Sequence, residues 1–408
     1  MISYVHRHIW HRLPQTWRRA ALMNLTARTA PRPTRDAKAS TPLIVAGTFR
    51  TASGLGQSAR LCHDALKATG VDVLGIDITK AMMQPEDLPD FAFADGHSHA
   101  GSGTVILHIN SPLVPLAMMK LGKRLVREKY IVGYWHWELP NPPRDWRYGV
   151  PFVHEIWTPS TFTAEALQTI SDGRPVRVVP HPIEKDFSLH MAAGKSQNRP
   201  FTVLFIFNAS SSFQRKNPLA VIAAFRRAFG DDPSARLIVK AANLENDSQH
   251  YKIICDHIAP SRNINLIQSL MSAAEIDALY ADSDVVISLH RSEGFGLILA
   301  EAMMRGLPVI ATDWSGNVDF VTAETGIPIP YRLIPASDPQ SATYDQPGTV
   351  WADADVEAAA DALRRLRRAP DLARHLGRAA AALAAREWSS QRYGTRARQI
   401  LNLKGKAV

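Results

Sequence analysis

The fold is decided by residues 284–320, which read DVVISLHRSEGFGLILAEAMMRGLPVIATDWSGNVDF. The apolar run at 285–289 is typical of a buried strand, and the glycine-bearing loop after it leads into a helix predicted from Leu297 to Arg305. Another apolar strand follows at 308–311. Strand, loop, helix and strand in this order indicate a parallel sheet with helices packed on its faces.

The loop before the predicted helix has the residues of an anion site. Backbone N–H groups converge there at the positive end of the helix, and the glycines allow close approach of a diphosphate because they lack Cβ. The residues concerned are Gly294, Phe295, Gly296 and Leu297. Glu293 and Glu301 stand eight residues apart around this turn. Carboxylates accept hydrogen bonds from pairs of hydroxyl groups, so we expect the segment to hold both ends of a nucleotide sugar.

The same alternation of strands and helices extends over most of the chain. Strands are predicted at 43–46, 71–78, 104–109, 130–135, 155–157, 176–179, 202–207, 236–240, 264–267, 285–289 and 308–311. We therefore predict an α/β fold of two doubly wound, parallel-sheet, Rossmann-like domains that face each other across a cleft, where sheets of this kind bind ligands. The predicted parts are a basic N-terminal segment with its linker (1–40), a first domain (41–182), an interdomain linker (183–200), a second domain (201–385) and a C-terminal helix that packs back toward the first domain (386–408).

Composition excludes several classes of protein. Of the 408 residues, 46% are hydrophobic and 21% are charged, which is the balance of a globular protein with a sizeable core. Cys62 and Cys255 are too few and too far apart for a disulfide framework or a cysteine-ligated zinc site, and they indicate a reducing compartment. No apolar stretch reaches the roughly 20 residues of a membrane-spanning helix.

The net charge of +9 comes mostly from the N-terminal segment. Residues 1–40 hold eight Arg or Lys residues against Asp36, which leaves about +2 for the rest of the chain, so nucleic-acid binding is not indicated. Aromatic and aliphatic residues at 2–25 are interleaved with Arg and His. This pattern fits a basic amphipathic segment on an anionic bilayer surface, a disordered leader or, by composition, a mitochondrial presequence.

Residues 284–320 closely resemble the signature of retaining GT-B glycosyltransferases of the group 1 (family 4) type. That signature is E-G-F-G-L-x-x-x-E followed by A-x-G-x-P-V-I, and the tail here reads MRGLPVI at 304–310. The resemblance covers most of residues 42–400 and is most specific in 200–320. It implies that Glu293 contacts the donor sugar, that Glu301 binds the ribose and that the backbone between them holds the diphosphate.

A second segment with this resemblance is FNASSSFQRKNP at 207–218. The family carries an R/K-K-N/G motif here, which implies that Lys216 neutralises donor phosphate as the leaving group departs and that Arg215 assists it. The family usually has another basic residue at the end of the preceding strand. Asn208-Ala-Ser210 stands there instead, so that role is vacant or passes to Arg215.

A third segment, GYWHWELP at 133–140, lies where the family ends a strand with an aromatic-x-His pattern. The resemblance implies that His136 reaches the reacting sugar from the acceptor side. Trp135, Trp137 and Trp146 are expected to offer aromatic faces to sugar rings. His108, which ends the preceding strand, is a weaker acceptor-side candidate.

The glycine-rich stretch Gly54-Leu-Gly56-Gln-Ser-Ala59 supports two interpretations. It satisfies the dinucleotide fingerprint G-x-G-x-x-A, and Asp77 ends the next strand, as in an NAD-binding unit. However, the strand before it ends near Ala46, too early for the tight turn of that fingerprint. The resemblance favours a longer loop in which Gly54 and Gly56 bind the donor.

No catalytic metal and no cofactor are expected. The pairs Asp282/Asp284 and Asp353/Asp355 have the Asp-x-Asp spacing of metal-dependent glycosyltransferases with the other fold. The first pair precedes a strand and the second opens a helix, so capping and solvent contacts explain both more simply.

The resemblance implies transfer of a hexose, with retention, from a nucleoside diphosphate sugar to a saccharide or polyprenyl-linked saccharide in exopolysaccharide or lipopolysaccharide assembly. GDP-mannose is the first donor expected and UDP-glucose the second. The enzyme would be cytoplasmic, working at the inner face of a membrane if residues 1–38 bind there. Three other classes stay open: an NAD-dependent oxidoreductase, a nucleotide-sugar epimerase, and a nucleotide-binding protein without turnover.

Overall fold

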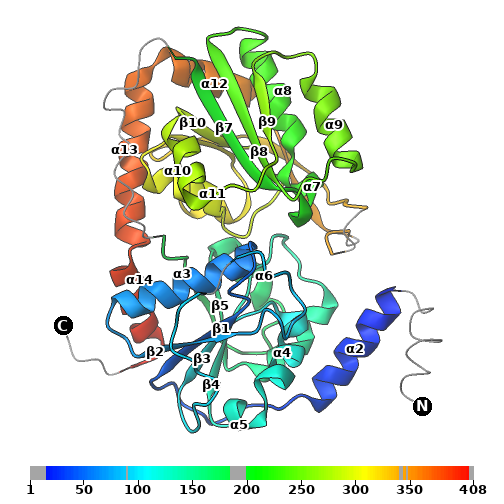
Figure 1. Ribbon diagram of the computed structural model, residues 1–408, viewed down its shortest axis with the longest axis vertical. Helices are drawn as coiled ribbons and strands as arrows, with labels where there is room; N and C mark the ends of the chain where they lie inside the picture. The colour runs from blue at the N-terminus through cyan, green and yellow to red at the C-terminus, as the bar shows by residue number, and fades with distance from the viewer. Residues whose placement is uncertain (1–14, 89–90, 184–198, 340–342, 346–347, 404–408) are drawn as a thin grey trace.

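The computed structural model describes residues 15–88, 91–183, 199–339, 343–345 and 348–403. It contains two parallel six-stranded sheets, one in each domain (Figure 1). In the first sheet the order is β2-β1-β3-β4-β5-β6, with β1 Leu43–Gly47, β2 Val73–Asp77, β3 Thr104–His108, β4 Tyr130–Tyr134, β5 Glu155–Thr158 and β6 Val176–Val178. In the second it is β12-β11-β10-β7-β8-β9, with β7 Phe201–Asn208, β8 Ala235–Ala242, β9 Ile264–Ile267, β10 Val285–Ser288, β11 Val309–Thr312 and β12 Ile327–Ile329.

Helices cover both faces of each sheet, as the predicted fold class requires. In the first domain they are α2 Gln15–Thr29, α3 Gly54–Ala68, α4 Val114–Leu121, α5 Lys123–Val126 and α6 Thr161–Gln168. In the second they are α7 Phe213–Lys216, α8 Pro218–Phe229, α9 Gln249–Ile258, α10 Ala273–Ala281, α11 Leu297–Met304, α12 Val356–Arg368 and α13 Pro370–Glu387. The last helix, α14, spans Ser390–Ile400.

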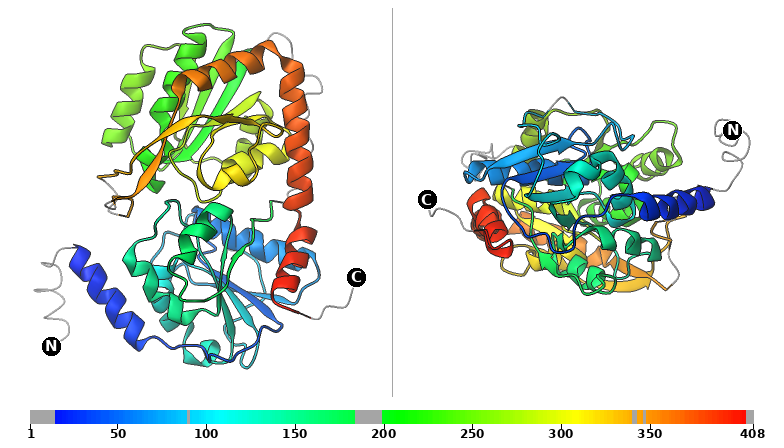
Figure 2. Two further views of the ribbon diagram at one scale, coloured as in Figure 1. Left: turned by 180° about the vertical axis from the view of Figure 1, so that it is seen from behind. Right: turned by 90° about the horizontal axis from the view of Figure 1, so that it is seen from below.

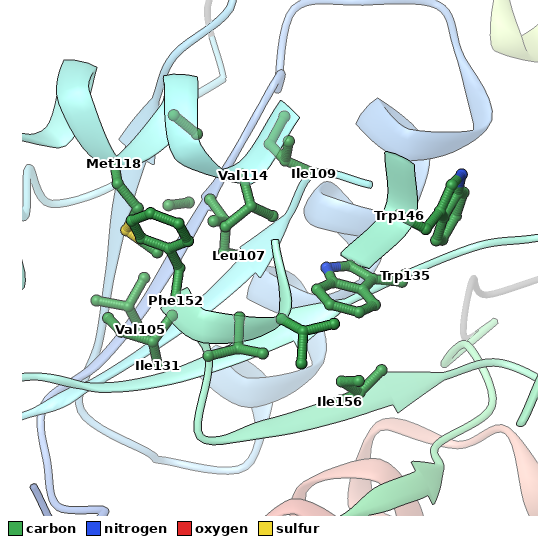
Figure 3. Packing of buried hydrophobic residues seen from close by; sticks show 14 of the residues in the cluster. Val105, Leu107, Ile109, Val114, Met118, Ile131, Trp135, Trp146, Phe152 and Ile156 are labelled. Carbon is green, nitrogen blue, oxygen red and sulfur yellow. The ribbon is translucent and has the colours of Figure 1, made fainter. Parts of the chain in front are cut away.

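The first sheet separates two hydrophobic cores because successive strand residues face opposite sides. Leu43 and Val45 of β1 pack with α3 and α14, whereas Ile44 and Ala46 face the core beneath α4. That second core also holds Val105, Leu107, Ile131 and Phe152 (Figure 3). The second sheet is divided in the same way, with β7 packing on α8 and α12 through Val203 and on α11 through Leu204.

The chain returns to the first domain at its C-terminal end. α13 runs down one side of the molecule and α14 lies beside α3 (Figures 1 and 2). The Tyr393 hydroxyl is 3.1 Å from Cys62 Sγ, and Arg398 donates to the Thr69 carbonyl at 2.7 Å. Helix α14 is thus a structural part of the first domain.

The N-terminal segment is described from residue 15 onward, so the part of the predicted amphipathic segment before it lies outside the described residues. α2 packs beside α4, with Met23 and Thr26 buried and Leu22 and Leu25 exposed. Within the described part of the chain, no helix combines the length and the apolar character needed to cross a bilayer.

The main difference from the sequence prediction lies between residues 321 and 353, where no element was expected. β12 joins the second sheet there, and β13 Tyr331–Pro335 pairs antiparallel with β14 Val350–Ala354. This hairpin extends from the second domain toward the first, and Trp351 and Ala336 belong to the core of the first domain around Trp135 and Trp146. Most of the predicted linker, residues 184–198, lies outside the described residues.

Candidate active site

Glu293 is held between two basic side chains. It lies in the loop between β10 and α11, where Arg215 Nη1 is 3.2 Å from Glu293 Oε2 and Lys216 Nζ donates to Glu293 Oε1. Arg215 and Lys216 belong to α7, which follows β7. β7 and β10 are neighbours in the sheet, and parallel neighbours end at the same edge. The structure therefore joins residues that the sequence placed in two separate motifs.

The three charged groups of this cluster shift one another's pKa values. Burial acts to raise the pKa of Glu293, but the charges of Lys216 and Arg215 outweigh it and lower that pKa to about 2. Burial lowers the pKa of Lys216, and the like charge of Arg215 lowers it further. The attraction of Glu293 acts in the opposite direction but does not outweigh them. Burial also disfavours the charge on Arg215, yet Tyr344 and Glu293 raise its pKa. The carboxylate of Glu138 also acts on both Arg215 and Lys216, so two cations face two carboxylates here. Guanidinium and ammonium groups placed together are the donors that bind phosphate in proteins.

Arg215 is fixed by backbone contacts as well as by Glu293. It is 2% exposed, and its guanidinium donates to the carbonyls of Ser292 and Ser211, each at 2.8 Å. The same guanidinium lies over the ring of Tyr344, 5.4 Å from its centroid. A fixed cation needs little reorganisation when charge develops beside it.

The N-terminus of α11 is open in the way the sequence predicts. The N-cap residue Gly296 has φ +102°, a conformation that glycine adopts at low cost, and it provides no side-chain cap for the first N–H groups of the helix, which starts at Leu297. The Gly294 carbonyl accepts from Ser160 at 2.6 Å and from Thr163 at 3.1 Å, so the first domain holds this loop. A Cβ on Gly316 would lie 2.3 Å from that same carbonyl.

The contacts of Phe295 and Glu301, two residues predicted to bind the nucleotide sugar, restrict which of their atoms can reach a ligand. Phe295 is 4% exposed and packs on His181, Phe320 and Trp388, so only its backbone is available to a ligand. Glu301 lies on α11 and accepts a hydrogen bond from the Tyr280 hydroxyl at 3.1 Å. Glu301 thus lies on α11 beside Tyr280 of α10, whereas Glu293 lies in the loop before α11.

Three histidines surround Tyr134 in the first domain. His136 Nε2 is 3.1 Å from His181 Nε2, with the two rings stacked, and His108 stacks on Tyr134 with its Nδ1 2.7 Å from the Ser58 hydroxyl. Burial lowers the pKa of all three histidines, in the case of His136 to about 3. Within the described chain, His136 Nδ1 is buried without a hydrogen-bond partner. The hydrogen-bonding capacity of this nitrogen is therefore unused in the described part of the chain.

His181 was missed by the sequence analysis. It follows β6 in the segment Val-Val-Pro-His-Pro at 178–182. Its ring meets Phe295 edge to face at 5.2 Å, so it connects His136 with the loop after Glu293. The end of a parallel strand was the signal that could have found it.

The prediction that Trp135 and Trp137 offer aromatic faces to sugars is wrong. They are 0% and 2% exposed and pack against Trp146, which is itself buried. Figure 3 shows Trp135 and Trp146 in this core. Trp137 is also covered by Tyr344, whose ring stacks on it at 5.9 Å and whose hydroxyl is 3.2 Å from Glu138 Oε2. These tryptophans form core packing beneath the β13–β14 hairpin.

The glycine-rich stretch is also different from the expected loop. Gly54 and Gly56 form the first turn of α3, after an N-cap at Ser53, rather than a loop. A Cβ on Gly56 would lie 2.4 Å from Thr51 Oγ1, whereas one on Gly54 would meet nothing within 4 Å. Asp77 Oδ1 accepts from the backbone N–H groups of Phe49 and Thr79. These contacts use Asp77 to hold the loop after β1, which disfavours the NAD interpretation.

The Asp-x-Asp pairs are engaged in other contacts. Asp282 pairs with Arg236, Asp284 with Arg199 and Asp353 with Arg332, while Asp355 caps α12. No group of three or more His, Cys, Asp or Glu residues is placed to hold a metal within the described residues.

Comparison with known proteins finds a family match for the second domain. Residues 194–383 match the family model described as glycosyl transferases group 1. The chain is 29% identical over 129 residues to trehalose synthase of Rubrobacter xylanophilus and 28% over 112 residues to that of Pyrococcus horikoshii. These alignments cover 30% and 26% of this chain, and 31% and 27% of the length of the two relatives.

Solved structures with the same fold extend over both domains. A glycosyltransferase of Rickettsia africae is 15% identical with a TM-score of 0.63, covering 90% of this chain and 98% of that one. Anabaena HepE in complex with UDP and glucose is 14% identical with a TM-score of 0.61, covering 88% and 99%. Sucrose-phosphate synthase of Thermosynechococcus elongatus is 15% identical with a TM-score of 0.62, covering 89% and 98%. The chain has the GT-B fold, and residues 194–383, most of its second domain, match the group 1 glycosyl transferase family.

Proposed function

We propose that this chain is a retaining, metal-independent glycosyltransferase that moves a hexose from a nucleoside diphosphate sugar to a saccharide or lipid-linked saccharide. The observation that carries the proposal is the Arg215–Lys216–Glu293 cluster beside the open N-terminus of α11. It lies inside the domain that matches group 1 glycosyltransferases.

The cluster supports departure of a diphosphate. As the anomeric bond lengthens, negative charge develops on the leaving phosphate and positive charge on the sugar ring. Arg215, Lys216 and the N–H groups that start α11 would stabilise the phosphate charge, and Glu293 would orient sugar hydroxyls. In the free protein Glu293 neutralises part of the cationic charge, so donor phosphate competes with it for Lys216.

His136 would act from the first domain. Its Nδ1 is buried without a described partner, and its depressed pKa leaves the ring neutral at physiological pH. A neutral imidazole can accept from or donate to a hydroxyl group, depending on its tautomer. We propose that it positions the transferred sugar against the acceptor.

Two nucleotide sugars are proposed as donors, in a stated order. UDP-glucose is the donor to test first, because Anabaena HepE was solved with UDP and glucose, and GDP-mannose is the second.

For the acceptor, a membrane-bound lipid-linked saccharide is favoured by α2, which exposes Leu22 and Leu25 on a basic segment.

Thermal unfolding of the purified chain with UDP, GDP, ADP and NAD, each without metal, tests the donor class. A nucleotide at 100 times its Kd should add about 2.7 kcal/mol of stability. Stabilisation by one nucleoside diphosphate supports the proposal and names its base, whereas stabilisation by NAD alone would refute it. Product analysis with the matching sugar nucleotide then separates transfer to an acceptor from epimerisation or binding without turnover.

A further inference from the structure

A hollow opens beside the Arg215–Glu293 cluster, over the ends of β7 and β8. It has a volume of about 280 Å³ and is lined by the loop before α7, the start of α9 and Asp338 of the β13–β14 connection. In Figure 1, α7 and α9 lie on the same side of the second domain, with the orange hairpin next to α7. None of the roles described above uses this hollow.

The pocket has an apolar floor and a polar rim. Ala209, Phe213 and Leu244 are buried in the floor, and His250 stacks on Phe213 with the ring centroids 4.1 Å apart. Asn243 and Glu245 are exposed at the rim. A flat stacked wall beside hydrogen-bonding groups suits a sugar ring, which has apolar C–H faces and hydroxyl edges.

The charges of the lining select among ligands. Glu245 and Asp338 contribute carboxylates, Asp338 being 3% exposed, and the described lining residues include neither Lys nor Arg. Such a site repels phosphate and carboxylate groups. The volume of about 280 Å³ is also just below the roughly 300–1,000 Å³ typical of small-molecule sites, which fits one sugar ring better than a nucleotide.

The pocket shares a wall with the candidate active site. The Ser212 hydroxyl donates to Asp338 on the pocket side and accepts from the Arg215 N–H at 3.1 Å, so that it caps the helix that carries Arg215 and Lys216. A ring in the pocket would therefore lie close to the residues that act on the donor, without occupying the diphosphate site.

We propose that this pocket is a subsite for an uncharged hexose unit of the acceptor saccharide. The identification of the ligand as acceptor rests on the proposed glycosyltransferase function, whereas the affinity of the pocket for a hexose does not.

Saturation-transfer NMR titration of the full chain with methyl α-glucoside, methyl α-mannoside and methyl α-glucuronide tests the proposal, with and without saturating UDP and GDP. We expect an uncharged glycoside to bind in both conditions and the glucuronide to bind at least about tenfold more weakly. Glu245→Ala and Ser210→Trp, which remove a rim acceptor and fill the hollow, should each weaken binding about tenfold or more.

Asp247→Ala is the matched control, because Asp247 is exposed in the same turn but does not line the pocket. It should leave glycoside binding unchanged. The proposal is overturned if no uncharged glycoside binds, if the glucuronide binds equally well, or if both pocket variants bind like the parent. Loss of the proposed function would show instead as failure of every nucleoside diphosphate to bind, with glycoside binding in the pocket unaffected.

Discussion

Replacing Glu293 with glutamine removes the carboxylate that lies between Arg215 and Lys216 while keeping the size of the side chain. The fall of the Glu293 pKa from 4.5 to about 2 corresponds to about 3 kcal/mol of stability. Breaking a buried ion pair by removing one partner costs roughly 3–5 kcal/mol, which agrees in size. We therefore expect Glu293→Gln to lower the free energy of unfolding by about 3 kcal/mol at pH 7.

Urea unfolding followed by tryptophan fluorescence measures this loss. Glu357→Gln is the matched control, since Glu357 pairs with Arg364 and Arg227 on the surface, where such pairs contribute about 0–1 kcal/mol. The pH dependence has a definite sign. Because the folded pKa of Glu293 is the lower one, its contribution is complete above about pH 4.5 and is lost as the pH falls toward 2.

The same variant tests the anion site. Without Glu293, Arg215 and Lys216 have no carboxylate between them, so a nucleoside diphosphate should bind at least as tightly as to the parent while sugar transfer is lost. Titration calorimetry and a transfer assay measure these two quantities. A variant that unfolds like the parent would refute the electrostatic reasoning, and one that transfers sugar at the parental rate would refute the role of Glu293.

Three further predictions concern other parts of the chain. His108, His136 and His181 are neutral in the folded chain but have pKa values near 6.5 in the unfolded chain, so the free energy of unfolding should fall as the pH drops below 6.5. His108→Gln should make this fall less steep by up to about 1.4 kcal/mol per pH unit, as measured by urea titrations at pH 7 and 5. Gly316→Ala should abolish the stabilisation of the chain by nucleotide, because the added Cβ meets the Gly294 carbonyl. Gly54→Ala should change the free energy of unfolding by no more than about 0.5 kcal/mol, and it should raise the KM for a donor that passes this residue. Equal behaviour of the two variants would contradict both arguments. Replacing exposed Leu22 and Leu25 by serine should weaken sedimentation with anionic phospholipid vesicles, and unchanged sedimentation would exclude α2 from membrane binding.

The sequence predicted those elements whose pattern is local. The apolar strand before His290 and the glycines before Leu297 placed β10 and α11 within about one residue, because strand burial and helix starts depend on neighbouring residues. The β13–β14 hairpin escaped prediction because most of β13 is exposed and has neither a strand nor a helix period. Tyr344, in the connection between the two strands, packs on Trp137 and Arg215, which are far away in the sequence.

The sequence predicted which residues form the candidate site, but it did not predict the contacts and the burial of those residues. Glu293, Lys216 and Arg215 lie together, but nothing in their spacing showed that they bind one another in the free protein. A tryptophan that follows a strand can face either solvent or core, and the 3-10 helix Arg144–Tyr148, which carries Trp146, decides in favour of the core for Trp135 and Trp137. Such decisions depend on tertiary packing, which local sequence does not encode.

The placement of α14 on α3 has a consequence for biosynthesis. Tyr393 and Ala397 complete the hydrophobic core that Cys62 and Leu66 begin, although the second domain lies between these residues in the chain. During translation, the first domain therefore leaves the ribosome with one face of its sheet incompletely covered, and it cannot be sealed until the second domain and α13 have also been synthesised. Chaperones that bind exposed apolar surface would have this interval in which to act on the nascent chain.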